Sequence, residues 1–453
     1  MAIVIRNGVI ANAYGCFRAD ILIENDRIAQ IESSIECANA ECIDAEGCFV
    51  MPGFIDTHTH FDLDTGSAVT ADDFVTGTRA AILGGTTTIL DFATQDRDGT
   101  LTQAYEKWQD KARGSSCNYG FHMAMARFDE SVSEEMQKMH DIGITSYKLY
   151  MVYDSLKVDD GAVYMALKRA KELGSIIGVH CENYDLLKAI NTELHKNGAG
   201  VDPYSHALSR PNEVEAEAVA KLIYIARLAD APVNIVHLST EEAMLEVRRH
   251  RACFEKPYIY VETCPQYLLL NDDKYHDDGR RYIMSPPLRK QKDVEALWDA
   301  LEDGNVDTIG TDHCSFTLAQ KNKCDYSDVP NGIPGVMYRP SIMLSEGLLG
   351  GRCSIEKLVK LMSYNPAKLY GLTDRGEIKV GAFADMTIWS KESEHVLTDT
   401  NHAHNCDYSP YAGLTVRGTI RDVILNGRHV VHGGELLVSG SGHYIARDEY
   451  TDL

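Results

Sequence analysis

Residues 53–60, Gly53-Phe54-Ile55-Asp56-Thr57-His58-Thr59-His60, end a short apolar run with two histidines on alternate positions. Side chains two apart on a β-strand face the same side, so the imidazoles of His58 and His60 can point at one place. Neutral imidazole is the commonest protein ligand of metal ions. Taken alone, the two histidines could equally be polar residues on the solvent-exposed face of a strand. Further ligand-type residues downstream favour the metal site.

The composition is ordinary for a globular protein and argues against several classes of partner. The 453 residues are 44% hydrophobic and 25% charged, with a formal net charge of −23. This charge argues against nucleic acid or an anionic membrane as partner and suits an enzyme of neutral or cationic small molecules. No apolar run reaches the length of a membrane span, and the N-terminus lacks the features of a signal peptide. Twelve cysteines without a Cys-x-x-Cys pair then predict a cytoplasmic protein with reduced thiols.

The chain divides into three regions and a tail. The sequence pattern of residues 1–50 and 376–437 predicts short strands separated by turns. Residues 51–375 alternate apolar strand-like runs with helical stretches, which is typical of repeated β-α units and a parallel sheet. We expect both end regions to join into one small β-sandwich, with residues 438–453 as a C-terminal tail.

Eight strand-like segments of the central region each end near a polar or ionisable residue. These residues are His60, Asp91, His122, Lys148, His180, His237, Glu262 and Asp312. Eight such units fit a (β/α)8 barrel with insertions, so the predicted class is α/β, a TIM-like barrel beside the sandwich.

Six candidate metal ligands are expected at one mouth of this barrel, because active sites of such barrels lie at the carboxyl ends of the strands. They are His58, His60, Lys148, His180, His237 and Asp312. An ammonium group beside two divalent cations would be disfavoured by like charge. Lys148 fits there if CO2 carbamylates it, which gives a carboxylate able to bridge two ions. The set suits zinc, or manganese, with the ions about 3.5–4 Å apart.

Motifs along the whole chain resemble the cyclic amidohydrolases, specifically the dihydropyrimidinase and hydantoinase family. The matching stretches are residues 52–60, 72–81, 84–88, 206–211, 262–268, 285–289 and 331–335. The resemblance implies a binuclear centre with His58, His60 and Asp312 on one ion, His180 and His237 on the other, and carbamylated Lys148 and a hydroxide between them.

The resemblance also implies how a cyclic diamide would be held and opened. Tyr153 matches the family tyrosine that donates a hydrogen bond to the substrate carbonyl, and Ser285 and Asn331 match positions whose backbone groups hold the ring amide. Tyr153 would stabilise the oxyanion formed when hydroxide attacks. Asp312 would take the hydroxide proton and pass it to the leaving nitrogen.

The loop after the second histidine bears on which ring is opened. No arginine follows His60, which argues against the acidic substrate of a dihydroorotase-like chain. The stretch Leu63-Asp64-Thr65-Gly66-Ser67 replaces the Met-Pro-Phe-Gly-Gly of many dihydropyrimidinase-like sequences and resembles the bacterial D-phenylhydantoinase branch. We expect Leu63, Thr65, Phe92 and Leu156 to shape the pocket. The favoured reaction is opening of aryl-substituted hydantoins to N-carbamoyl D-amino acids.

Two alternatives stay open. The first is a dihydropyrimidinase that opens dihydrouracil or dihydrothymine. The second is a non-catalytic scaffold, since some relatives keep the fold but have lost metal ligands; against it, all six ligand positions are filled here. The family is usually tetrameric, so a homotetramer is expected, with the segment from Asn405, including residues 408–411, against neighbouring subunits.

Smaller expectations concern residues near the site. Cys264 and Cys314 are expected to be buried inert thiols, and His206 and Arg210 to form a structural network. His313 should face away from Asp312. Finally, Glu213, Glu215 and Glu217 are expected to form a solvated start of a helix.

Overall fold

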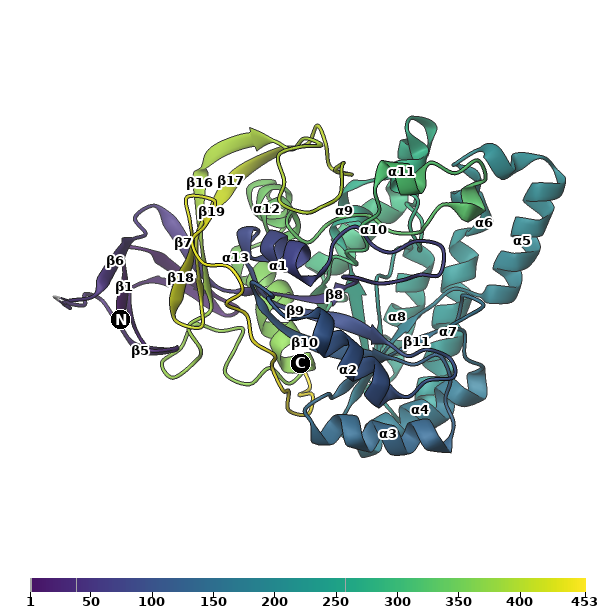
Figure 1. The fold of residues 1–453 in the computed structure, drawn as a ribbon, viewed down its shortest axis with the longest axis horizontal. Coiled ribbons are helices and arrows are strands. Elements are labelled where there is room, and N and C mark those ends of the chain that lie inside the picture. Colours follow the sequence, from purple (N-terminus) through teal and green to yellow (C-terminus); the bar gives the residue numbers. More distant parts are fainter. Residues whose placement is uncertain (1, 38, 257) are drawn as a thin grey trace.

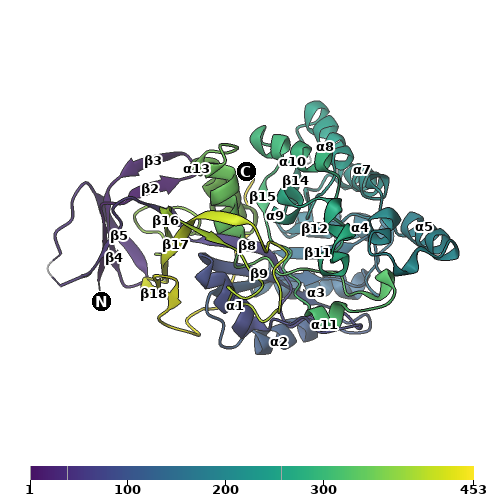
Figure 2. The same cartoon turned by 90° about the horizontal axis from the view of Figure 1, so that it is seen from above.

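A barrel and a β-sandwich lie side by side in the computed structural model, which describes residues 2–37, 39–256 and 258–453. Figure 1 shows the sandwich at the left and the barrel at the right, with the N-terminus on the sandwich and the C-terminus against the barrel. Figure 2 shows the same two parts from above.

The barrel is an eight-stranded parallel sheet whose strands follow one another in chain order. Its strands are β8 Phe54–Thr59, β9 Thr86–Thr94, β10 Asn118–Ala124, β11 Ser146–Tyr150, β12 Ile176–His180, β13 Val233–Ile235, β14 Ile259–Thr263 and β15 Thr308–Ile309. The sheet closes where the His60 N–H donates to the His313 carbonyl (2.8 Å) and the His313 N–H donates to the His58 carbonyl (3.3 Å). Both faces of these strands are covered. Their sequences are therefore continuous apolar runs and do not alternate between apolar and polar residues. The predicted (β/α)8 barrel is confirmed.

Helices surround the barrel strands. The α-helices are α1 Phe74–Leu83, α2 Leu101–Lys111, α3 Glu130–Asp141, α4 Asp160–Glu172, α5 Tyr184–Lys196, α6 Ser205–Ser209, α7 Asn212–Ala229, α8 Glu241–Cys253, α9 Pro265–Leu269, α10 Gln291–Glu302, α11 Leu318–Lys321, α12 Arg339–Ile342, α13 Ile355–Val359 and α14 Asn365–Leu369. The short 3-10 helices are η1 Ala199–Val201, η2 Asp272–His276, η3 Gly279–Tyr282 and η4 Tyr326–Asp328. Two π-helical segments are η5 Met343–Leu349 and η6 Lys360–Tyr364. Several begin at a capping side chain: Asp73, Thr100 and Asp129 each accept a backbone N–H of the first turn.

The sandwich consists of two sheets, one of which combines both ends of the chain. The four-stranded sheet has the order β5-β4-β1-β6, and the seven-stranded sheet has the order β19-β18-β17-β16-β7-β2-β3. The strands are β1 Ile3–Arg6, β2 Val9–Asn12, β3 Gly15–Arg18, β4 Asp20–Glu24, β5 Arg27–Glu32, β6 Glu41–Asp44, β7 Cys48–Pro52, β16 Met386–Val396, β17 Thr415–Leu425, β18 Arg428–His432 and β19 Glu435–Leu436. β7 and β16 pair antiparallel, from Met386 opposite Pro52 to Ser390 opposite Cys48. The predicted joining of the two chain ends is confirmed.

The C-terminal tail runs across the barrel face opposite the mouth. The Ile445 N–H donates to the Tyr119 carbonyl, the Arg447 N–H to the Gly143 carbonyl, and the Tyr450 N–H to the Gly174 carbonyl. These acceptors lie at the start of β10 or just before β11 and β12, which are amino ends of barrel strands. The Arg447 side chain is 4% exposed. Its guanidinium donates to the carbonyls of Phe121 and Tyr370.

The segment around residue 408 packs inside its own subunit. Tyr408 and Ser409 are fully buried, and Tyr411 is almost so. The Tyr408 hydroxyl donates to the Arg281 carbonyl (2.9 Å). The expectation that residues 408–411 meet neighbouring subunits is therefore wrong, because their side chains already fill the space between the barrel and this segment.

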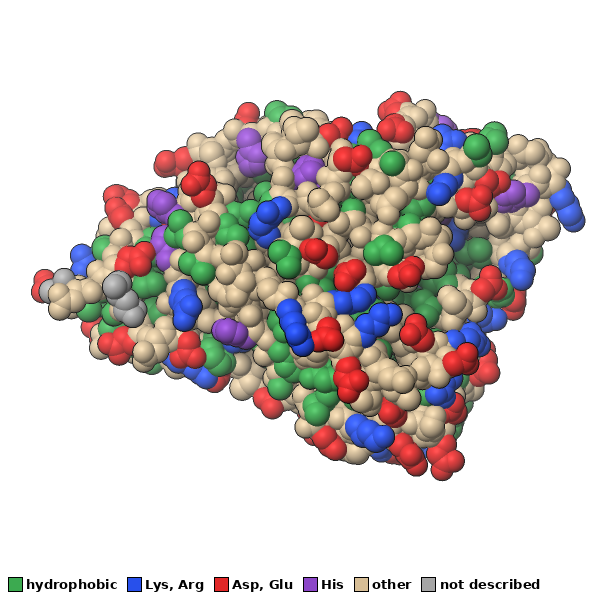
Figure 3. All heavy atoms as spheres, viewed as in Figure 1, with side chains coloured by type: hydrophobic (Ala, Val, Ile, Leu, Met, Phe, Trp, Pro, Cys, Tyr) green, Lys and Arg blue, Asp and Glu red, His purple; other side chains and the backbone are tan. Residues whose placement is uncertain are grey.

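The surface carries charges of both signs. Acidic and basic side chains are interspersed over the face drawn in Figure 3. Among the described residues, no helix combines the length and apolar character that crossing a membrane requires.

Replacing Arg447 tests the role of the tail. Arg447→Ala removes the donor to two buried carbonyls and leaves a cavity, so we expect a loss of about 3 kcal/mol in the free energy of unfolding, measured by denaturant titration. Arg113→Ala is the control, because the Arg113 side chain is 80% exposed. We expect it to change stability by less than about 0.5 kcal/mol. Equal stability of the two variants would show that the tail does not support the barrel.

Candidate active site

The predicted site residues converge on one cavity of about 880 Å³ at the carboxyl ends of the barrel strands. Its lining includes His58, His60, Lys148, Tyr153, His180, His237, Ser285, Asp312 and Asn331. Of the four predicted specificity residues, Leu63, Thr65 and Leu156 also line it. The cavity wall further includes Gln95, Arg97, Trp108, Lys111 and Lys323, which the sequence did not single out because they come from helices and loops without a motif.

Phe92 does not reach the cavity wall. Its ring packs against those of His58 (4.6 Å between centroids), His60 (4.9 Å) and His122 (4.8 Å). The ring supports the two histidines from the barrel interior. Phe92 also belongs to a cluster against which Tyr153 and Leu156 of the cavity wall pack, so its expected influence on the pocket stays a prediction and would act through packing.

His58, His60 and Asp312 form a compact donor group. Asp312 Oδ1 is 3.2 Å from Nε2 of His58 and 3.2 Å from Nε2 of His60. One ligand atom from each residue lies within 4.8 Å of the other two. The second histidine pair is adjacent: the rings of His180 and His237 are 4.5 Å apart, and those of His58 and His237 are 5.3 Å apart.

Two buried glutamates orient these imidazoles from behind. Glu262 Oε1 is 2.6 Å from His58 Nδ1, and Glu182 Oε2 is 2.7 Å from His180 Nε2. A ring nitrogen bonded to a carboxylate carries the proton, so Nε2 of His58 and Nδ1 of His180 keep their lone pairs free. Carboxylates behind metal-binding imidazoles are typical of metal sites. The sequence does not reveal this role for either glutamate, although Glu262 lies in β14 near its end and Glu182 follows β12.

The histidines are held in the neutral form that binds metal. Burial lowers the pKa of His58 and His237 well below the ordinary value and also lowers the pKa of His180. Neutral imidazole has a lone pair to offer, whereas imidazolium does not.

Lys148 is a buried amine without a hydrogen-bond partner among the described residues. It lies on β11 and is 1% exposed. Its Nζ has no acceptor within reach and sits 5.1 Å from the Phe92 ring centroid. Burial lowers the pKa of Lys148 to about 8. An unpaired buried ammonium is costly, so the position suits an amine that is modified or joined to an ion.

Three site residues adopt left-handed backbone conformations. The φ angles are 74° at Tyr153, 42° at His237 and 52° at Asp312. Residues other than glycine rarely adopt such angles, and in folded proteins they cluster at functional sites. Each of the three follows the end of a barrel strand by two or three residues, where the chain turns into the mouth.

Further polar side chains line the same cavity. Ser285 Oγ and Asn331 Oδ1 are buried and have no hydrogen-bond partner among the described residues. Burial raises the pKa of the Tyr153 phenol, which keeps it protonated as a donor. The Tyr153 ring lies 5.3 Å from that of His180. These groups could bind an amide bond placed between them and the histidines.

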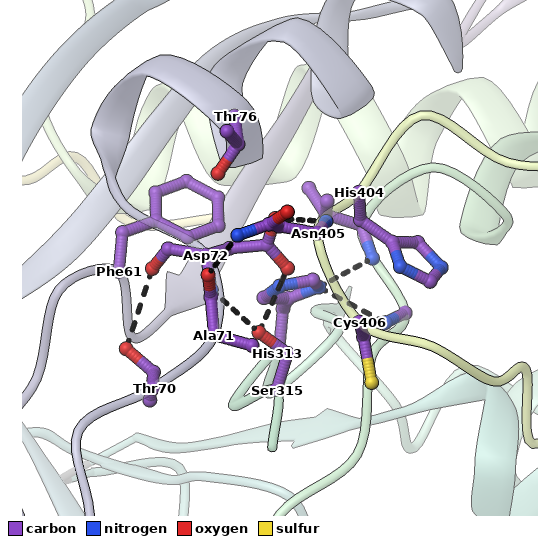
Figure 4. A network of polar contacts seen from close by, with 12 residues as sticks. Phe61, Thr70, Ala71, Asp72, Thr76, His313, Ser315, His404, Asn405 and Cys406 are labelled. Carbon is purple, nitrogen blue, oxygen red and sulfur yellow. Dashed lines mark hydrogen bonds and ion pairs between the residues drawn. The ribbon is translucent and has the colours of Figure 1, made fainter. Parts of the chain in front are cut away.

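A buried carboxylate behind the site joins three segments, as Figure 4 shows. Asp72 accepts hydrogen bonds from His313 Nε2 (3.1 Å), Ser315 Oγ (2.7 Å) and the Asn405 N–H (2.6 Å). His313 Nδ1 accepts the Gly335 N–H (3.0 Å). Burial opposes ionisation, but His313 and the Asn405 N–H hold the pKa of Asp72 below its usual range. His313 therefore faces away from the cavity, as predicted, and fixes the chain next to Asp312.

The contact between His180 and Glu182 extends to Arg210 and His206, which were predicted to form a structural network. Arg210 Nε is 3.3 Å from Glu182 Oε1, and Arg210 also contacts His206. His206 Nε2 is 2.7 Å from the Met284 carbonyl, next to Ser285. The network therefore connects the orientation of one histidine with the opposite wall of the cavity.

Glu215 and two cysteines complete the surroundings. Glu215 accepts from the Ser239 N–H (2.8 Å) and Arg289 (2.9 Å) and is buried. The prediction of a solvated position is wrong for Glu215, because α7 turns this side toward the barrel. Cys264 and Cys314 are buried, and burial raises the pKa of both thiols, in agreement with inert cysteines.

The barrel and this donor set are those expected of an enzyme with a candidate metal site at the carboxyl ends of its strands, and comparison identifies its family. A model of the amidohydrolase family matches residues 49–430. The chain belongs to the amidohydrolase family.

Full-length relatives are named for cyclic amide hydrolysis. The chain is 39% identical to a D-hydantoinase of Geobacillus stearothermophilus, covering 100% of this chain and 98% of the relative. It is 38% identical to a D-phenylhydantoinase of Escherichia coli O1:K1 / APEC, covering 99% of each. The crystal structure of a dihydropyrimidinase from Brevibacillus agri NCHU1002 matches with a TM-score of 0.98 at 37% identity, covering 100% of both chains. The resemblance to the hydantoinase and dihydropyrimidinase group is confirmed.

His195 supports one wall of the cavity through hydrogen bonds from both ring nitrogens. His195 Nδ1 is 2.7 Å from the Asn191 carbonyl, and its Nε2 is 3.0 Å from both carboxylate oxygens of Asp325. Both partners accept, so the ring donates from both nitrogens. The Asn191 carbonyl and Asp325 raise the pKa of His195. Asp325 precedes η4, and residues 327–332 line the cavity.

The raised pKa predicts that this wall loosens at high pH. The stabilisation is complete below the ordinary histidine pKa of about 6.5 and is lost as the pH rises through the raised value in the folded protein. We expect hydrogen exchange of residues 323–332, corrected for its intrinsic pH dependence, to speed up as the pH rises above the ordinary histidine pKa of about 6.5 and through the raised pKa of His195. His195→Gln should show fast exchange throughout, and His395→Gln on exposed β16 should behave as the wild type. Wild-type protection that does not change with pH would contradict the role of His195.

Proposed function

We propose that this chain is a binuclear metal-dependent cyclic amidase that opens 5-substituted hydantoins, with aryl substituents preferred, to N-carbamoyl D-amino acids. The observation that carries the proposal is the meeting of four histidines, one aspartate and a buried amine without a hydrogen-bond partner on one cavity. The names of the full-length relatives agree with this chemistry.

The residues present fit two divalent cations of the zinc class, with manganese as the alternative. Neutral imidazoles and a carboxylate are donors that such ions prefer. His58, His60 and Asp312 would hold one ion, His180 and His237 would hold the other, and Lys148 as a carbamate would bridge them. Two bound cations would lower the pKa of a shared water and polarise the amide carbonyl.

The chain's own groups would perform the proton transfer and orientation. The Tyr153 hydroxyl would donate to the carbonyl oxygen as negative charge develops on it. Asp312 would accept the proton from the attacking water and deliver it to the ring nitrogen as the C–N bond breaks. The backbone groups of Ser285 and Asn331 would hold the ring amide.

The cavity supports a bulky exocyclic group. Its volume of about 880 Å³ is far larger than a single five-membered ring requires. Leu63, Leu156 and Trp108 contribute apolar wall around the mouth.

Dihydropyrimidinase activity is the second candidate, since a structure of almost identical fold bears that name. Homotetrameric assembly and a cytoplasmic location stay predictions from the sequence.

Relative turnover of two substrates tests the proposed preference. We expect a higher kcat/KM for 5-phenylhydantoin than for dihydrouracil, because the apolar wall offers an aryl group a surface that dihydrouracil does not use. Faster opening of dihydrouracil would favour the dihydropyrimidinase. If zinc-loaded protein opens neither ring, the scaffold alternative stands.

Removal of the Tyr153 hydroxyl tests its proposed role as a hydrogen-bond donor in the reaction. Tyr153→Phe should lower kcat by about 100-fold to 1,000-fold, the usual cost of removing one oxyanion donor. Bound metal should stay at the wild-type level, because Tyr153 is not among the proposed ligands. Tyr224→Phe, at a residue 68% exposed on α7, is the matched control and should leave kcat unchanged. An unchanged kcat in Tyr153→Phe would remove Tyr153 from the reaction.

Removal of the amine tests Lys148. Lys148→Ala should lose both bound metal and ring opening, since no bridging carboxylate can form. Treatment of the wild type with a chelator should abolish activity, and zinc together with bicarbonate should restore it. Full metal content and activity in Lys148→Ala would contradict the bridge.

A further inference from the structure

A second group of nitrogen and oxygen donors lies in the β-sandwich. It consists of Asp422 on β17 and of His429 and His432 on β18, whose ligand atoms all lie within 4.8 Å of one another. Asp422 Oδ1 is 2.6 Å from His432 Nδ1 and 3.1 Å from His429 Nε2. None of the three residues lines the barrel cavity or takes part in the proposed ring opening.

A β-bulge brings the two histidines to the same side. The ladder between β17 and β18 pairs Asp422 with His432 and then shifts register by one residue. The extra residue lets Val430 and Val431, neighbours in sequence, both be fully buried in the core. In a regular strand, residues three apart face opposite sides. With the bulge, His429 and His432 both face the side of Asp422.

Two further side chains hold the donors in place. Glu41 Oε1, on β6 of the other sheet, is 2.8 Å from His429 Nδ1. Arg421 Nε is 2.5 Å from Asp422 Oδ2. A carboxylate on the far nitrogen of an imidazole is the usual support of a metal-binding histidine, and the same arrangement occurs at His58 and His180. Arg421 leaves Asp422 Oδ1 as the oxygen directed at both histidines.

We propose that Asp422, His429 and His432 bind a divalent cation of the zinc class. Two imidazole nitrogens and one carboxylate oxygen match the ligand preference of such ions. Asp422 is fully buried, whereas the His432 side chain is 66% exposed, so an ion could enter from the His432 side and complete its coordination with water. The ion would replace protons that the ring nitrogens otherwise share with Asp422 Oδ1.

Bound at this place, the ion would connect β17 with β18, since Asp422 and both histidines belong to the seven-stranded sheet. The contact of His429 with Glu41 of the four-stranded sheet would reach the ion only indirectly, by holding the His429 ring in place. The competing explanation is a cluster of hydrogen bonds and ion pairs that never takes up metal.

Zinc content per chain distinguishes the two explanations. His432→Ala removes one proposed ligand at an exposed position, so folding should be preserved. His395→Ala, an exposed histidine on β16 of the same sheet, is the matched control. Full-length wild type and both variants are saturated with ZnCl2, freed of unbound metal and analysed by inductively coupled plasma mass spectrometry. Thermal unfolding is recorded for each with and without zinc.

We expect His432→Ala to hold one zinc fewer per chain than the wild type and His395→Ala, and to lose part of the rise in Tm on adding zinc. Ring opening should be equal in all three. The barrel ligands are common to all three proteins, so their occupancy cancels from the comparison, and a failure of the proposed function leaves this result unaffected. Equal zinc content in all three would overturn the site. Asp422→Asn, which preserves volume, should lose the same single zinc.

Discussion

The contacts of Glu262 with His58 and of Glu182 with His180 are the constraint on which the site depends. Each carboxylate accepts a hydrogen bond from the far nitrogen of its imidazole, so the proton stays on that nitrogen and the near side presents a lone pair to the cavity. Burial disfavours protonation of the ring. Without these contacts, a histidine at a strand end could turn or change tautomer, and the donors would no longer share one centre.

The barrel provides these contacts because its parallel strands end at one level. Glu262 ends β14 next to β15, and the chain beyond β15 bonds to β8, which carries His58. The closure between His58, His60 and His313 thus brings the first and last strands together and places Asp312 beside both histidines. Asp72 then fixes His313 from outside the barrel and ties it to the C-terminal segment. The geometry of the mouth is in this way determined by residues that never touch the cavity.

The sequence predicted the barrel, the joined sandwich and all six donors that face the cavity. Strand ends are marked by a change from apolar runs to ionisable residues, and the topology of a barrel brings such ends together. The partners behind the histidines were missed, because a pairing such as Glu262 with His58 joins residues 204 apart and depends on closure of the sheet. Phe92 was expected to shape the pocket because its segment ends at the barrel mouth, and Tyr408 was expected at a subunit contact because the family resemblance implies one there. Neither reason indicates whether an aromatic ring is exposed or packed within the chain. Glu215 was expected in solvent because two neighbouring glutamates are charged, yet helix periodicity turns it inward to Arg289.

The pairing of β7 with β16 has a consequence for synthesis on the ribosome. Pro52 is synthesised long before its partner Met386. One edge of β7 therefore has no hydrogen-bonding partner while the intervening barrel is synthesised. An unpaired apolar strand edge is prone to wrong pairing and aggregation. Pairing of such long sequence separation also slows folding. The nascent chain therefore exposes this strand edge until β16 has been synthesised.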